Sequence, residues 1–181
     1  AEDHIFSKCS GQKTPEGVIA AVRIPKYSFI SIAADKKPLV ILDGINDPGN
    51  LGTILRTADA FGMGGVLMLP GCADAYSPKT VQSTMGSILR VKCMNAGEAE
   101  LNALKAAGYT VYGMTLEGKP MEQEDFSDSP IALVIGSESH GMGNFASGMC
   151  DKFLSIRMPG KAESLNAAIA AGIAMHHITW R

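Results

Sequence analysis

The chain has 181 residues, of which 46% are hydrophobic and 19% are charged, and its formal net charge is −2. This length and composition suit one soluble globular domain with a sizeable core. The small net charge argues against broad electrostatic binding to nucleic acid, but not against a local binding site. No apolar run approaches the roughly 20 residues that a membrane-spanning helix needs.

The four cysteines lie far apart in the sequence and include no C-x-x-C pair; they are Cys9, Cys72, Cys93 and Cys150. Metal clusters and disulfide frameworks depend on closely spaced or regularly spaced cysteines. We therefore expect no metal site, and reduced thiols in a cytoplasmic protein.

Residues 1–37 are less regular than the rest of the chain. They contain six of its sixteen basic residues, and two short apolar runs, 18–23 and 29–33, that could form strands. We expect this part to be a linker or the remnant of a preceding domain, with the main domain covering residues 38–181.

From residue 38 onward, apolar runs of strand length alternate with segments of helical periodicity. Several of the strand candidates are apolar throughout, which is typical of strands that helices bury on both faces, so a mainly parallel α/β sheet is predicted. Gly62 and Gly108 stand where two helices should end. The expected strands are 39–43, 65–69, 90–94, 109–114, 131–135 and 153–156, and the expected helices are 50–61, 78–86, 97–107, 141–149 and 164–179.

The first segment with unusual chemistry follows the first of these strands. A turn-rich loop, 44–49, leads into a helix at which Asn50 is the expected N-cap. Arg56 falls outside the apolar stripe of this helix, so packing does not explain it. It is either a solvated surface arginine or a ligand for a phosphate or carboxylate at the end of the sheet.

Two further loops follow later strands. Residues 136–141 (GSESHG) place Glu138 near the start of a helix, where a carboxylate is favoured. Residues 156–166 (IRMPGKAESLN) precede a long apolar helix, for which Ser164 is the expected N-cap and Asn166 lies near the free backbone amides. The expected buried stripe of that helix is Leu165, Ala168, Ile169, Gly172 and Ile173.

Together, the segments 50–62, 133–142 and 156–166 resemble the three ordered motifs of the SpoU/TrmH branch of the SPOUT RNA methyltransferases. The resemblance covers about residues 38–180. It implies an enzyme that uses S-adenosylmethionine to methylate a ribose 2′-hydroxyl of RNA, with ribosomal RNA favoured over transfer RNA. It also implies a SPOUT fold with a C-terminal trefoil knot, a homodimer, and a linker or remnant of an RNA-binding domain at 1–37.

The resemblance also implies roles for individual residues. The family's catalytic positions are matched by Arg56, Asn50, Glu138, Ser164 and Asn166. The loops that hold the cofactor in the family are matched by Met114, Thr115, Gly136, Ile156 and Leu165. Because arginine keeps its proton at a pKa above about 12, we favour Arg56 as a cation rather than as the general base, and the proton acceptor stays open. Two positions depart from the family pattern. Arg157 stands where the family frequently has a proline, and Gln82 stands where it commonly has a basic residue.

Other readings of the same residues are a serine hydrolase and a catalytically silent RNA-binding module. The hydrolase would use Ser139, Asp151 and His176, which follow in the order of a known triad, although the first glycine of G-x-S-x-G is missing. A dinucleotide-dependent oxidoreductase is disfavoured because no G-x-G-x-x-G follows the first strand.

Overall fold

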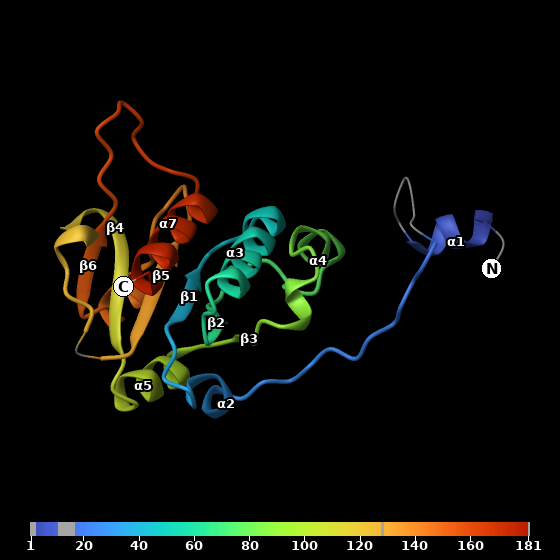
Figure 1. Cartoon of the computed structure of the whole chain (residues 1–181), viewed down its shortest axis with the longest axis horizontal. Helices are drawn as coiled ribbons and strands as arrows, with labels where there is room; N and C mark the ends of the chain where they lie inside the picture. The colour runs from blue at the N-terminus through green and yellow to red at the C-terminus, as the bar shows by residue number, and fades with distance from the viewer. Residues whose placement is uncertain (1–2, 11–16, 128, 181) are drawn as a thin grey trace.

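The computed structural model describes residues 3–10, 17–127 and 129–180, and its centre is a six-stranded sheet in the order β3-β2-β1-β5-β4-β6 (Figure 1). All five neighbouring pairs are parallel. The predicted α/β sheet is therefore confirmed. The strands are β1 (Leu39–Asp43), β2 (Gly65–Met68), β3 (Cys93–Asn95), β4 (Thr110–Pro120), β5 (Ile131–Gly136) and β6 (Lys152–Ser155).

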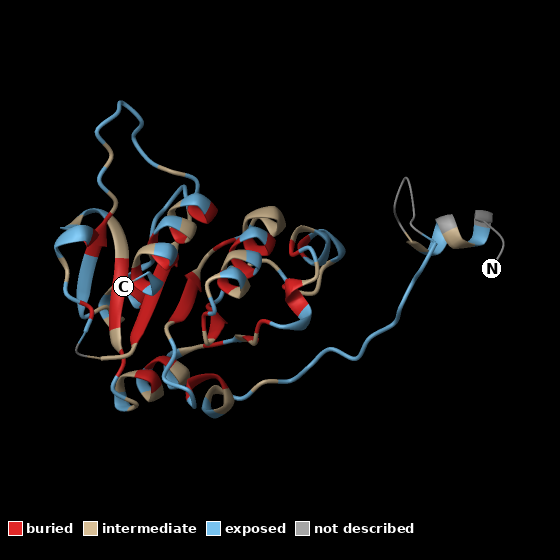
Figure 2. Cartoon of the chain, viewed as in Figure 1, coloured by how far each residue is buried: buried red, intermediate tan, exposed pale blue. Residues whose placement is uncertain are grey.

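Helices cover both faces of the sheet, which explains why its central strands are apolar throughout. One face packs against α3 (Pro48–Ala60), α7 (Ala167–Thr179) and the 3-10 turns η1 (Ser87–Leu89) and η2 (Met121–Gln123). The other face packs against α2 (Phe29–Ala33), α5 (Glu98–Ala106) and α6 (Asn144–Met149). Figure 2 shows the buried strands between these layers. The remaining helices are α1 (Asp3–Ser10) and α4 (Pro78–Ser83).

Two helices begin at residues other than those predicted. The N-cap of α3 is Asp47, whose Oδ1 accepts from the Asn50 amide at 2.8 Å, so the expectation for Asn50 was wrong. Pro48 fits the first helical position because it has no amide hydrogen to satisfy. The N-cap of α7 is Asn166, whose Oδ1 accepts from the Ala168 amide at 3.0 Å, and Ser164 lies outside the helix.

The buried face of α7 also differs from the prediction. Of the expected stripe only Ala168 is buried, whereas Ile169 and Ile173 are 54% and 40% exposed. The buried set is Ala167, Ala168, Ala171, Ala174, Met175 and Ile178. Since this helix is apolar almost all round, periodicity could not distinguish the face that packs on the sheet from the face that does not.

The N-terminal part contains neither of the two predicted short strands. Residues 29–33 form α2. Its N-cap is Ser28, whose hydroxyl accepts from the Ser31 amide at 3.3 Å. Residues 18–23 are extended but pair with no strand in the described structure, and they run away from the sheet (Figure 1). The structure does not test whether residues 1–37 are a linker or a domain remnant.

Several predicted boundaries also move. The strand expected at 90–94 is shorter and later, and the one expected to end at residue 114 continues to Pro120. Gly62 and Gly108 follow helices with φ angles of 65° and 83°, as their positions predicted.

Among the described helices, none has the length and apolar character that a membrane crossing requires.

Candidate functional site

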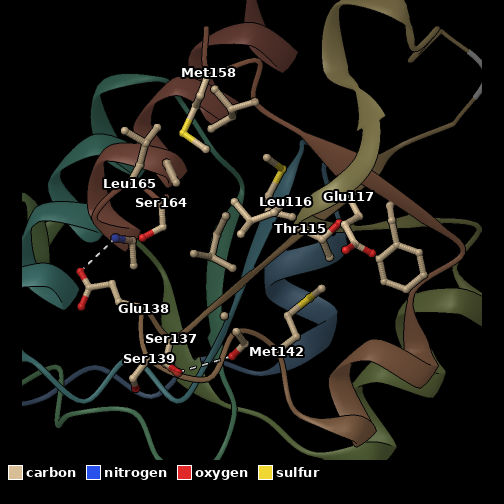
Figure 3. Close-up of a pocket in the computed structure, with 18 residues that line it drawn as sticks. Thr115, Leu116, Glu117, Ser137, Glu138, Ser139, Met142, Met158, Ser164 and Leu165 are labelled. Carbon is tan, nitrogen blue, oxygen red and sulfur yellow. Dashed lines mark hydrogen bonds between the residues drawn. The ribbon is translucent and has the colours of Figure 1, made fainter. Parts of the chain in front are cut away.

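A pocket of about 770 Å³ lies at the carboxyl edge of the sheet, where ligands of parallel α/β proteins bind (Figure 3). Four stretches of chain form it, and Figure 3 shows Thr115, Leu116 and Glu117 facing Ser164 and Leu165 across it. Its lining is Met114, Thr115, Leu116, Glu117, Ile135, Gly136, Ser137, Glu138, Ser139, Gly141, Met142, Phe153, Ile156, Met158, Ser164, Leu165, Ala167 and Ala170.

All five residues that were predicted to hold a cofactor line this pocket: Met114, Thr115, Gly136, Ile156 and Leu165. Met114 and Thr115 lie at the bulge within β4, Gly136 and Ile156 lie at the carboxyl ends of β5 and β6, and Leu165 lies in the loop before α7. The parallel register brings these ends together, with Asp43 of β1 beside Gly136 of β5. The fold thus assembles residues that are up to about fifty positions apart in the sequence.

Gly136 sits where the chain folds tightly back on itself. The loop after it closes through two backbone hydrogen bonds between Ser137 and Gly141, of 2.9 and 3.0 Å. A Cβ atom at Gly136 would lie 2.3 Å from the Gly141 carbonyl carbon and 2.4 Å from the Met142 nitrogen. Only glycine allows this approach, and Gly136, Gly141 and Met142 all line the pocket.

Glu138 joins three parts of the site through one carboxylate oxygen. Its Oε1 accepts from the Asn50 side-chain amide at 2.9 Å, from the Asn166 side-chain amide at 2.5 Å and from the Ala167 backbone amide at 3.0 Å. The two asparagines are also bonded to each other at 3.1 Å. A negative charge at the start of α7 is stabilised by the helix dipole. Three predicted site residues therefore form one cluster.

A second, smaller hollow of about 70 Å³ lies beside this cluster and is lined in part by residues of the segment 44–50. Ser137, Glu138 and Ser139 line both hollows. In the loop, the hydrogen bond from the Asn50 amide lowers the pKa of the Asp47 carboxyl, and Lys79 at 3.6 Å lowers it further. Because the two hollows share Ser137, Glu138 and Ser139, groups bound in them would meet beside the Glu138 cluster.

Arg56 is not part of this cluster. It is exposed on α3, lines neither hollow, and makes no hydrogen bond or ion pair with any residue that the structure describes. Its guanidinium is thus free to bind a partner from outside the chain. Ser164 does line the larger pocket, in the loop that precedes α7.

The residues of the serine-hydrolase reading are not brought together. The Ser139 hydroxyl lies 2.7 Å from Nδ1 of His140, not beside His176. Asp151 pairs with Lys105 at 2.8 Å, and the His176 ring is stacked on Trp180. A nucleophile, a base and a carboxylate must form one hydrogen-bonded chain to act as a triad. This reading was wrong.

Sequence reasoning missed several lining residues, among them Glu117, Phe153 and Met158. Glu117 lies in β4, which was expected to end three residues earlier, at residue 114. Phe153 and Met158 are single apolar residues without a distinctive spacing. Ser137 and Ser139 could have been found, because they lie within the GSESHG segment that contains Glu138.

The parallel sheet and the built pocket at its carboxyl edge define an α/β protein that binds a small ligand there. Comparison with known proteins gives the family. The sequence profile of the SpoU rRNA Methylase family matches residues 37–176. The chain is 34% identical over 174 residues to the 23S rRNA (guanosine(2553)-2′-O)-methyltransferase RlmP of Bacillus subtilis, covering 96% of this chain and 68% of that protein.

Solved structures agree with this match. The AdoMet complex of the SpoU methyltransferase AviRb from Streptomyces viridochromogenes is 34% identical, with a TM-score of 0.72, over 78% of this chain and 59% of that one. An AdoMet-bound rRNA methyltransferase from Sinorhizobium meliloti is 28% identical, with a TM-score of 0.81, over 97% of this chain and 69% of that one.

The chain belongs to the SpoU rRNA methylase family. S-adenosylmethionine, the AdoMet of these two structures, is the cofactor of this family. The chain spans between 59% and 69% of the length of the three relatives described above.

Proposed function

We propose that this protein transfers a methyl group from S-adenosylmethionine to a ribose 2′-hydroxyl of RNA, with ribosomal RNA favoured over transfer RNA. The observation that carries the proposal is the pocket at the carboxyl edge of the sheet, beside the cluster of Glu138, Asn50 and Asn166. The 2′-O specificity and the ribosomal substrate are supported by the name of the Bacillus subtilis relative.

The pocket fits the cofactor in size and in chemistry. A volume of about 770 Å³ lies within the range of about 300–1,000 Å³ that small-molecule sites occupy. Met114, Ile156 and Leu165 supply apolar walls, and Ser137, Ser139 and Ser164 supply polar groups. When bound, S-adenosylmethionine supplies a methyl group activated by a positively charged sulfur.

The residues around the pocket would align and stabilise the substrate. Glu138 holds Asn50 and Asn166 in one arrangement, and correct alignment of the reacting groups supplies much of the rate in such transfers. Ser164, at the pocket edge, would orient the ribose. Arg56 would bind the neighbouring phosphate as a cation and stabilise the negative charge that develops on the ribose oxygen.

We further propose that the protein works as a homodimer, with the active site near the subunit interface. The support is the exposed apolar face of α7, which presents Ile169, Ile173 and Trp180. This helix packs against α3, which bears Arg56, so a subunit that covers α7 would lie close to the free guanidinium. A trefoil knot within 38–181, and a linker or the remnant of an RNA-binding domain at 1–37, complete the proposal. The four free cysteines support a cytoplasmic location.

The direct test uses S-adenosylmethionine with a tritiated methyl group and either ribosomal or transfer RNA, followed by digestion to nucleosides. We expect label in one 2′-O-methylated nucleoside of ribosomal RNA. Label on a base, or in neither RNA, would contradict the proposal.

Arg56→Ala should lower the rate by about 100-fold or more, because a stabilising charge is lost. Arg56→Lys should also be slow, since lysine lacks the planar fork of donors. Lys37→Ala, at the amino edge of the sheet, is the matched control and should be unchanged.

A further inference from the structure

One wall of the pocket is a segment that leaves the regular pairing of the sheet. In the ladder between β4 and β6, Met114 and Lys119 are both paired with Leu154. The intervening residues 115–118 bulge out of that ladder. Because Met114 to Glu117 line the pocket, the position of residues 114–118, here called the wall segment, shapes the site (Figure 3).

The C-terminal end of the wall segment is pressed against β6. A Cβ atom at Gly118 would lie 2.5 Å from the carbonyl carbon of Leu154, and the Gly118 carbonyl accepts from the Ser155 hydroxyl at 2.7 Å. The wall segment is therefore supported at its ends, where its neighbours pair, rather than along its length. Whatever fixes Lys119 and its neighbours in β6 fixes the wall as well.

Glu124 provides such a support from outside the pocket. Its side chain is only 6% exposed, and its two oxygens accept from Lys119 Nζ at 2.8 Å and Lys152 Nζ at 2.5 Å. The Tyr112 hydroxyl donates to the same carboxylate at 3.4 Å. Tyr112 precedes the wall segment, Lys119 follows it, and Lys152 begins β6. One carboxylate thus contacts both sides of the wall and the neighbouring strand.

The charge of Glu124 suits this role. The hydrogen bonds from Lys119 and Lys152 lower the pKa of the Glu124 carboxyl, so it is ionised at neutral pH. An ion pair between two exposed side chains contributes little to stability. Removing the charge of a nearly buried carboxylate costs more, because its lysine partners are left without an acceptor. A glutamine at this position would turn one oxygen into an amide, whose N–H groups would face a lysine ammonium.

We propose that Glu124 is a positioning residue that sets the affinity for S-adenosylmethionine by holding the wall segment in place. This inference rests on the proposed function of the pocket. Glu124 does not line the pocket, so it acts on the cofactor only through Tyr112, Lys119 and β6.

The test compares Glu124→Gln with Asp151→Asn by calorimetric titration of S-adenosylmethionine into the full chain. Asp151 is a matched control, because it ties the start of β6 to β4 through the Val111 amide at 2.8 Å and to α5 through Lys105 at 2.8 Å, but does not line the pocket. We expect the dissociation constant to rise about tenfold in Glu124→Gln, the size of one charge-assisted hydrogen bond, and less than about twofold in Asp151→Asn. Turnover at saturating cofactor should change little, since the reacting groups are untouched.

Equal binding by Glu124→Gln and the unaltered chain would overturn the inference, and so would a similar loss of affinity in both variants. If Glu124→Gln does not fold, Lys119→Met decides: it alters a half-exposed side chain and should weaken binding several-fold, and unchanged affinity there would overturn the inference. Failure of the unaltered chain to bind S-adenosylmethionine is a separate result, and it would overturn the proposed function together with this inference.

Discussion

At the scale of single residues, the carboxylates of this protein act mainly by joining segments. Glu138 connects the first turn of α3 to the start of α7, and Asp59 connects α3 to the turn η1. The Asp59 carboxylate accepts from the Ser87 hydroxyl at 2.7 Å and from Arg90 Nη2 at 2.5 Å. These bonds lower the pKa of Asp59, the one to Arg90 most strongly. They also fix the helix that presents Arg56.

This shift predicts how stability depends on pH. Because the pKa of Asp59 is lower in the folded chain than its ordinary value of 3.8, the carboxylate stabilises the fold above that value, and the contribution is lost as pH falls through the folded pKa. Asp59→Asn should therefore be less stable than the unaltered chain at pH 7, and the difference should shrink as the pH falls below 3.8 and through the lowered pKa of the folded chain. Urea unfolding at several pH values measures it. A difference that stays constant down to pH 2 would show that the charge is not its source.

The residues of the site were predictable from sequence where motifs flank strand ends. The resemblance to the family motifs assigned Met114, Thr115, Gly136, Ile156 and Leu165 to the cofactor, and all five line one pocket. The hydrogen bonds that join Glu138 to Asn50 and Asn166 were not predictable, because they depend on the exact approach of three loops. The part played by Glu124 had no signal in the sequence at all.

At the scale of elements, the position of α3 depends on how closely it approaches α4. Gly52 makes that approach, for a Cβ atom there would lie 2.4 Å from the Ser83 Cβ and 2.7 Å from the Thr80 carbonyl oxygen. Gly172 in α7 faces α3 with more room, and its nearest neighbour would be Thr57 Cγ2 at 3.7 Å. The two glycines thus have the same secondary structure but different surroundings.

A pair of substitutions separates packing from helix propensity. Gly52→Ala should destabilise the fold by about 1–3 kcal/mol, because the added methyl group overlaps backbone atoms that cannot move freely. Gly172→Ala should be neutral or stabilising by up to about 1 kcal/mol, as alanine favours a helix and has space here. Denaturant unfolding of both variants checks this. Equal effects would contradict the close packing of α3 on α4.

Elements were predicted from sequence most reliably where burial is complete. Strands β1 and β5 are apolar and buried except at their last residues, Asp43 and Gly136, and were found almost to the residue. The buried face of α7 was wrong because an apolar helix gives no preferred side, and residues 18–23 have the composition of a strand without a partner in the described structure. Helix starts were displaced because Asp47 and Asn50, and likewise Ser164 and Asn166, are equally suitable caps.

At the scale of the whole molecule, the exposed side of α7 is the surface that a second subunit would cover. Ile169, Ile173 and Trp180 expose apolar area on this side, while the opposite side of the helix is buried against the sheet (Figure 2). Apolar area of this kind is stabilised by contact with another apolar surface. The neighbouring α3 carries Arg56, so dimerisation and activity should depend on one another.

Ile173→Glu should therefore weaken the dimer, since a charge would be buried without a partner at the interface. Size-exclusion chromatography with light scattering should show a dimer for the unaltered chain and a monomer for the variant, with slower methyl transfer. Ile30→Glu is the control, because Ile30 is 80% exposed on α2, at the other face of the sheet. The proposal fails if the unaltered chain is monomeric, or if both variants behave alike.

The central claim is that the pocket at the carboxyl edge holds S-adenosylmethionine, and calorimetric titration of the cofactor tests it most directly. The unaltered chain should bind about one cofactor per subunit. Gly136→Ala should bind at least about tenfold more weakly, because its Cβ would displace the Gly141–Met142 backbone beneath the pocket. Gly148→Ala, whose Cβ would meet no atom within 4 Å, should bind normally. Absence of binding by the unaltered chain, or equal binding by Gly136→Ala, would contradict the account.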